Sequence, residues 1–202
     1  MDERFELYYN LLKEWNEKFN LTAITEKDKI ELLHFKDSIL PEDLIKQNAT
    51  VLDIGSGAGF PAIPLKIVRD DLDITMVDSL NKRVTFLNEV ISKLNLERAK
   101  AVHKRAEDLD KNVKYDVVTA RAVAPMRVLC EYCIPFVKKG GIMLAYKSED
   151  VEEELNQAQK AIDVLGGKLL KTEVRKFVII EKVKESPLSY PRGGNKPRLK
   201  PL

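Results

Sequence analysis

The sequence predicts an α/β fold: a mostly parallel sheet of seven strands, the last antiparallel, preceded by an N-terminal helical extension. From about residue 48, short apolar runs alternate with amphipathic stretches, as in strands joined by crossover helices. A glycine-rich turn follows the first of these runs, where parallel sheets bind nucleotide-like ligands. The final two strands lie too close together for a helical crossover, so we expect them to pair antiparallel.

Residues 1–47 are predicted to form a helical cap. Residues 2–20 carry large apolar side chains at helical spacing, which predicts an amphipathic helix with these residues inward: Phe5, Tyr8, Tyr9, Leu12, Trp15 and Phe19. The stretch Thr25-Glu26-Lys27-Asp28 resembles a capping box that opens a second helix. That helix is expected to end at Pro41 and to bury Ile30, Leu33 and Leu40.

The main domain is predicted over residues 48–185. Strands are expected near residues 50–54, 73–78, 99–103, 115–120, 141–146, 168–174 and 176–183. Helices are expected near residues 61–69, 80–94, 126–137 and 149–165. Ser148 is the expected N-cap of the last helix, and Gly166-Gly167 its end. Residues 186–202 form a basic Pro/Gly-rich tail that we expect to be neither helix nor strand.

Composition narrows the class of protein. A chain of 202 residues, 44% hydrophobic and 33% charged, suits one packed domain with an extension. The formal net charge is only +2, so any affinity for nucleic acid must come from local patches. The start Met1-Asp2-Glu3-Arg4 lacks the apolar core of a signal peptide, and no apolar run has the length of a membrane span. We therefore expect a cytoplasmic protein that does not contact membranes, and we expect a monomer.

The glycine-rich turn after the first predicted strand is the most informative stretch. Gly55, Gly57 and Gly59 are spaced G-x-G-x-G, whereas a dinucleotide fingerprint would need a glycine in place of Phe60. Asp53 lies just before the glycines, and its carboxylate suits a cationic ligand better than a pyrophosphate. S-adenosylmethionine carries a sulfonium and an ammonium group, so the loop predicts this cofactor.

The order of elements, ending in a β-hairpin, resembles the Rossmann-like class I methyltransferase fold. Asp78 ends the second predicted strand, about twenty residues beyond the loop, where a ribose-binding acid belongs. Ala106 and Glu107 follow the third strand, where such enzymes contact adenine. The amide of Ala106 would serve adenine N1 and the Glu107 carboxylate its exocyclic amine. The alternative for Glu107 is a solvated acid at the start of a helix.

No side chain stands out as an acid–base catalyst. Methylases of exocyclic amines carry an Asn- or Asp-Pro-Pro-aromatic turn after the fourth strand, where this chain has Arg121. Cys130 and Cys133 could attack a pyrimidine, but their apolar neighbours favour core positions. His34 and His103 are isolated, and a single C-x-x-C predicts no metal site. A ring nitrogen with a free lone pair, such as guanine N7, attacks a sulfonium methyl without a base, and the sequence identifies no specific catalytic side chain.

Short segments spread along nearly the whole chain carry a closer resemblance: Trp15 to Ile24, His34 to Ser38, Gly55 to Pro61, Asp78-Ser79, Arg105 to Glu107, Arg121-Ala122 and Tyr190 to Arg192. Together they resemble the bacterial 16S rRNA (guanine-N7) methyltransferase G family, also called glucose-inhibited division protein B. The resemblance implies methyl transfer from S-adenosylmethionine to N7 of a guanine, at nucleotide 527, in 16S ribosomal RNA or the small ribosomal subunit. It also implies cofactor contacts by Gly55, Phe60, Ala106, Glu107 and Arg121.

Local basic groups are the candidate RNA contacts. The tail has no acid after Glu185 and carries four cations: Arg192, Lys196, Arg198 and Lys200. We expect three more at the strand-end rim: Arg121, Arg127 and Lys147. A solubilising tail and ordinary surface charges are the alternatives. For the whole protein, the alternatives are a small-molecule methyltransferase and a non-catalytic RNA- or ribosome-binding protein.

Overall fold

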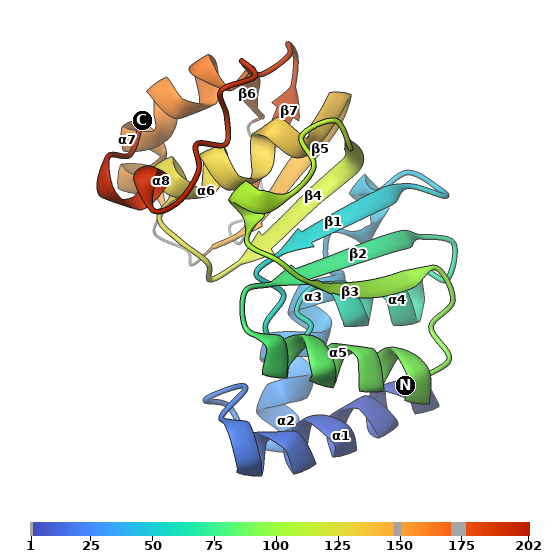
Figure 1. The fold of residues 1–202 in the computed structure, drawn as a ribbon. Helices are drawn as coiled ribbons and strands as arrows, with labels where there is room; N and C mark the ends of the chain where they lie inside the picture. Colours follow the sequence, from blue (N-terminus) through green and yellow to red (C-terminus); the bar gives the residue numbers. More distant parts are fainter. Residues whose placement is uncertain (1, 148–150, 171–176) are drawn as a thin grey trace. The chain divides into compact units, whose positions relative to one another are not determined.

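The computed structural model describes residues 2–147, 151–170 and 177–202 (Figure 1). The chain divides into two compact units, Met1–His103 and Lys104–Leu202. No helix among the described residues combines the length and the apolar character that crossing a bilayer requires.

The first unit opens with helix α1, Glu3–Phe19, which lies on α4 and α5 of the same unit (Figure 1). The Asp2 side chain caps its start by accepting a hydrogen bond from the Arg4 amide, and Asn20 ends it in a left-handed conformation. Most of the predicted stripe is inward, including Phe5, Tyr8 and Leu12. The prediction is wrong for Phe19, which is 37% exposed beneath the Lys82 ammonium group.

The second predicted helix is irregular. It consists of α2 (Lys27–Ile30), a π-helical turn η1 (Glu31–Lys36) and α3 (Asp37–Ile39), followed by the short η2 (Glu42–Leu44). The predicted capping box is wrong, because Glu26 is the N-cap and its side chain forms no capping hydrogen bond.

The inward side chains of this helix also differ from the prediction. Ile30 and Phe35 are each 2% exposed, whereas Leu33 is 38% exposed and Leu40 is 55% exposed. A π-turn closes its hydrogen bonds over five residues, so it brings residues five apart, such as Ile30 and Phe35, onto one face. The prediction assumed ordinary α-helical spacing and therefore selected the wrong leucines.

Three parallel strands form the sheet of the first unit in the order β3-β2-β1. They are β1 (Thr50–Ile54), β2 (Asp73–Asp78) and β3 (Ala99–His103), at the predicted residues. Helices α4 (Ala62–Val68) and α5 (Asn81–Lys93) also lie where they were predicted. β1 and β2 are buried almost throughout, which explains the apolar residues at their centres.

The second unit contains the other four described strands in the order β4-β5-β7-β6. β4 (Tyr115–Arg121) and β5 (Val137–Tyr146) are parallel. β7 (Phe177–Lys182) runs antiparallel to β5 and to β6 (Gly167–Leu170), which confirms the predicted terminal hairpin. The helices are η3 (Ala106–Asp108), α6 (Met126–Cys133), η4 (Ile134–Phe136), α7 (Glu152–Val164) and α8 (Lys196–Leu199).

Strand β5 begins at Val137, earlier than predicted. The strand was expected near residues 141–146, but its pairing with β4 starts at Val137 and continues across Gly140-Gly141 with a register shift. A Cβ on Gly141 would lie 2.4 Å from the Asp116 carbonyl oxygen of β4. The glycines therefore belong to a β-bulge inside the strand, where the two backbones approach closely.

The tail differs from the prediction, whereas the end of α7 agrees with it. The tail contains α8, so the expectation that it holds no helix is wrong; Pro197 lies in the first turn, where a missing N–H costs nothing. Gly166 adopts φ 82° just after α7, as expected for a helix end. The predicted N-cap Ser148, and parts of the predicted segments 149–165, 168–174 and 176–183, lie outside the described residues.

Candidate cofactor site

The glycine loop turns sharply at the end of β1. The amides of Gly55 and Ser56 both donate to the Val77 carbonyl oxygen, at 2.8 and 3.1 Å, which fixes the loop to the end of β2. Within the loop, the Gly59 amide donates to the Ser56 carbonyl at 2.7 Å. The three glycines have φ values of 71°, 57° and 97°, which other residues rarely adopt, so the backbone requires the G-x-G-x-G spacing.

Two of these glycines have different surroundings. A Cβ on Gly59 would stand 2.6 Å from Cγ1 of Ile63 and 2.9 Å from the Tyr8 hydroxyl, so Gly59 is required for packing. A Cβ on Gly57 would meet nothing closer than the Gly55 carbonyl oxygen at 3.9 Å. Gly57 therefore presents bare backbone to open space, which is what close approach of a ligand needs.

Two buried carboxylates flank the loop. Asp53, in β1, is fully buried, and Asp78, at the end of β2, is 3% exposed. Asp78 Oδ2 accepts from the Gly57 amide at 2.9 Å, and its Oδ1 accepts from the Leu80 amide at 2.9 Å. Arg83 lies 3.3 Å from Oδ2. Asp78 thus holds the loop against the start of α5, and Oδ1 has a second acceptor position for a hydroxyl group.

Three of the predicted cofactor residues lie in the second unit: Ala106 and Glu107 in η3, and Arg121 at the end of β4. Ala106 begins η3 and is 8% exposed, and Glu107 follows it with 6% of its side chain exposed. The Arg105 guanidinium lies 3.8 Å from the Glu107 carboxylate. This burial does not suit the alternative of a solvated acid. Arg121 is the last residue of β4 and is half-buried.

Comparison with known proteins identifies the family. Residues 1–179 match the family described as rRNA small subunit methyltransferase G (GidB). The chain belongs to this family. Ribosomal RNA small subunit methyltransferase G of Lactobacillus helveticus (strain DPC 4571) is 50% identical over 217 aligned positions, covering 99% of this chain and 90% of that protein. The protein of the same name from Lachnoclostridium phytofermentans is 50% identical over 215 positions, covering 99% and 89%.

Solved structures show the fold. A SAM-dependent methyltransferase from Aquifex aeolicus superposes with a TM-score of 0.58 at 19% identity, covering 87% of this chain and 98% of that one. An O-methyltransferase family protein from Burkholderia thailandensis gives 0.57 at 16% identity, covering 78% and 56%. The predicted Rossmann-like class I methyltransferase fold is confirmed.

The side chains considered as nucleophile or base are Cys130, Cys133 and His103. Their surroundings in this member of the methyltransferase G family favour structural roles. Cys130 and Cys133 are fully buried, and burial raises the pKa of the Cys130 thiol to about 12. A ring nitrogen of His103 lies 3.0 Å from the Ser79 carbonyl oxygen. The described residues contain no group of three metal-ligating side chains.

Several of the predicted RNA-binding cations have protein partners. Arg192 donates from its backbone N and Nε to Glu131 Oε1, each at 2.8 Å, and from Nη2 to Oε2; Glu131 is fully buried. Arg127 donates to the carbonyl oxygens of Leu202 and Pro201. Lys147 is bound to Glu154 and to the Ala124 carbonyl. These contacts hold the tail and α7 to the rest of the second unit.

The remaining tail cations lie on the surface. Lys196, Arg198 and Lys200 are exposed on and next to α8. Arg198 Nη2 reaches the Val123 carbonyl oxygen at 3.4 Å, and Val123 lies just beyond the end of β4. The tail is therefore anchored at Arg192 and presents its later cations to solvent.

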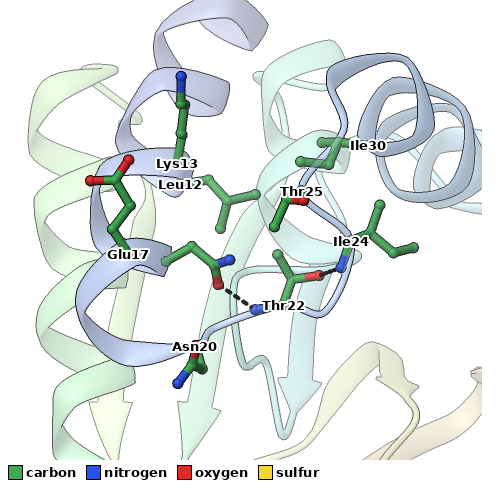
Figure 2. A pocket seen from close by; sticks show the side chains of 9 residues that line it. Leu12, Lys13, Glu17, Asn20, Thr22, Ile24, Thr25 and Ile30 are labelled. Atoms are coloured by element: carbon green, nitrogen blue, oxygen red, sulfur yellow. Dashed lines mark hydrogen bonds between the residues drawn. The ribbon is translucent and has the colours of Figure 1, made fainter.

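The helical cap contains a cavity that the sequence did not predict. It has a volume of about 330 Å³ and lies between α1 and residues 20–30, and its apolar lining residues are Leu12, Ile24 and Ile30 (Figure 2). The Thr22 amide donates to Asn16 Oδ1 at 2.8 Å, and its hydroxyl accepts from the Ile24 amide (Figure 2). Asn16, Glu17, Asn20, Thr22 and Ile24 line part of this cavity, and all five lie in the segment from Trp15 to Ile24 that carries the family resemblance.

Proposed function

We propose that this protein transfers a methyl group from S-adenosylmethionine to N7 of a guanine in 16S ribosomal RNA. The observation that carries the proposal is family membership across residues 1–179, combined with a glycine loop whose Gly57 presents bare backbone to open space. Relatives about 50% identical over nearly the whole chain bear the name of an rRNA methyltransferase, which supports RNA over a small metabolite as the substrate.

The loop and its flanking acids fit this cofactor. The backbone of Gly55, Gly57 and Gly59 would lie along the ligand, while the buried Asp53 carboxylate would favour its positive charge. Asp78 would accept a ribose hydroxyl at Oδ1. In the second unit, Ala106 and Glu107 would bind adenine, and Arg121 and Phe60 are further proposed contacts. Bound there, the cofactor supplies an electrophilic methyl group.

The protein's contribution to the reaction is alignment. Guanine N7 has a free lone pair and needs no deprotonation, so no side chain has to take a proton before transfer. Holding two reactants in line and excluding water can account for about 7–11 kcal/mol of barrier reduction. The buried carboxylates and the fixed loop supply such a preorganised site.

RNA binding is assigned to local cations. We propose that Lys196, Arg198 and Lys200 contact phosphates, together with Arg121, while Arg192, Arg127 and Lys147 chiefly hold the structure to which they belong. The protein would act as a monomer in the cytoplasm, where ribosomal subunits are assembled.

The test is labelled-methyl transfer to purified 16S rRNA and to small ribosomal subunits, followed by nuclease digestion and identification of the modified nucleoside. We expect 7-methylguanosine at one position. Methylation of neither RNA nor subunits, with S-adenosylmethionine bound normally, would favour a small-molecule methyltransferase. Absence of cofactor binding would favour a non-catalytic RNA-binding protein.

A further inference from the structure

The glycine loop rests on side chains of the N-terminal helices. Tyr8 of α1 is fully buried, and its hydroxyl donates to the Ala58 carbonyl oxygen in the middle of the loop. The same hydroxyl stands 2.9 Å from the position that a Cβ on Gly59 would take. Tyr8 thus holds the loop backbone on both sides of the bond between Ala58 and Gly59.

His34 holds the last residue of the loop. Its ring stacks on Phe60, with ring centroids 4.4 Å apart and planes inclined by 28°. Phe60 is 8% exposed and also contacts the ring of Tyr8, at 5.6 Å between centroids. An aromatic stack of this kind contributes beyond the area it buries, so it favours one orientation of Phe60.

The orientation of His34 is itself set by hydrogen bonds. Nδ1 lies 3.1 Å from the Leu33 carbonyl oxygen, which can only accept, so this nitrogen carries the proton. Nε2 lies 3.1 Å from the Thr22 hydroxyl, so both ring nitrogens have partners. Thr22 is bound through its amide to Asn16 of α1. The π-turn η1 contributes as well, because it carries both His34 and the buried Phe35.

We propose that Tyr8 and His34 are positioning residues for the cofactor loop. A loop with glycines at 55, 57 and 59 has large conformational freedom, and ordering it on binding would cost affinity. The contacts at Ala58 and Phe60 flank Gly59 and order the loop before the ligand arrives. The identity of the ligand as S-adenosylmethionine rests on the proposed function, whereas the ordering of the loop does not.

Four variants test the proposal by calorimetry with S-adenosylmethionine. His34→Ala should weaken binding about three- to tenfold, and Tyr8→Phe about threefold, the loss expected for one packing or hydrogen-bonding contact. His34→Phe should bind nearly as well as the wild type, because a phenyl ring can stack on Phe60 but cannot transfer a proton. Tyr9→Phe is the matched control, since the Tyr9 ring faces the Lys27 ammonium group. Turnover at saturating cofactor should stay within about twofold of wild type in every variant.

A second measurement needs no ligand. Amide hydrogen exchange at Gly59 and Phe60, both bonded to the Ser56 carbonyl oxygen, should be faster in His34→Ala and Tyr8→Phe than in the wild type or Tyr9→Phe. Unchanged exchange would overturn the proposal, whether or not the wild type binds the cofactor. Lost turnover in His34→Ala with normal cofactor affinity, not restored by His34→Phe, would also overturn it and make His34 a proton-transfer group. Failure of the wild type to bind S-adenosylmethionine, with exchange altered as expected, would instead contradict only the proposed function.

Discussion

Two glycines of the loop differ in their surroundings: Gly59 is packed against side chains, whereas Gly57 faces open space. Gly57 and Gly59 both have positive φ, so alanine strains the backbone at either position by about 1 kcal/mol. Only at Gly59 would the added Cβ also collide with Ile63. The two glycines look equivalent in the sequence, and only their surroundings distinguish them.

We therefore expect Gly59→Ala to lower the free energy of unfolding by about 2–4 kcal/mol, since overpacking adds to strain. Gly57→Ala should cost about 1 kcal/mol of stability but weaken S-adenosylmethionine binding at least tenfold, because its Cβ would occupy the space beside the ligand. Urea unfolding and calorimetry measure the two effects. Equal stability losses in the two variants, with cofactor affinity retained in Gly57→Ala, would contradict this assignment.

The cysteines and His103 should be dispensable for methyl transfer. A thiol whose pKa lies near 12 is not ionised at neutral pH, and Cys133 is fully buried beside it. Cys130→Ala, Cys133→Ala and His103→Ala should each keep activity within about tenfold, or 1.4 kcal/mol. Circular dichroism checks that each variant is folded. A folded, cofactor-binding cysteine variant without activity would indicate pyrimidine methylation instead.

At the scale of helices and strands, the sequence predicted regular elements well and irregular ones poorly. Apolar residues at the centres of β1 and β2 marked both strands to the residue, because the strands of a parallel sheet are buried on both faces. The π-turn at Glu31–Lys36 and the bulge at Gly140-Gly141 were missed. Both break the fixed repeat on which the predictions relied, and both are set by tertiary packing.

The candidate site shows the same division. The local sequence pattern alone predicts the positions where the backbone needs glycine, such as Gly55 and Gly57. It also predicts the acid Asp78 at the end of a strand. The support given by Tyr8 and His34 depends on contacts between residues far apart in the chain. Their spacing in the sequence gives no sign of it.

A buried lysine in β7 predicts how stability depends on pH. Lys182 is 1% exposed, and its ammonium group donates to the carbonyl oxygens of Ile134 and Leu165 and to the Ser186 hydroxyl. Burial lowers its pKa from 10.5 to about 8 in the folded protein. Between these values the unfolded chain binds more protons than the folded one. The free energy of unfolding should therefore rise with pH across this window.

Urea unfolding at pH 8 and pH 10 tests this dependence. The wild type should gain stability over this range relative to Lys182→Met, which has no titrating group at the position. Lys184→Met, an exposed neighbour in the chain, is the control and should keep the wild-type dependence. An identical pH dependence in Lys182→Met and the wild type would show that Lys182 titrates normally.

For the molecule as a whole, Arg192 of the tail contacts a buried carboxylate, and the later cations of the tail are proposed to bind RNA. Arg192 neutralises the fully buried Glu131, so removing its charge leaves a carboxylate buried without compensation. Arg192→Gln should lower the free energy of unfolding by about 3–5 kcal/mol, the range for breaking a buried ion pair. Thermal and urea unfolding measure the loss, and a variant as stable as the wild type would contradict the anchoring role.

A net charge of only +2 makes RNA affinity depend on where the cations lie, and the exposed ones lie beyond this anchor. Each phosphate contact on unpaired RNA contributes about −0.7 to the slope of log K against log salt. Replacing Lys196, Arg198 and Lys200 with Gln should therefore flatten that slope by roughly 2, with stability and S-adenosylmethionine affinity nearly unchanged. Replacing the surface cations Lys13, Lys93 and Lys168 instead gives a variant of equal charge. An equal change of slope in that control would mean that RNA senses the net charge, whereas a change confined to the tail variant would place the phosphates at α8.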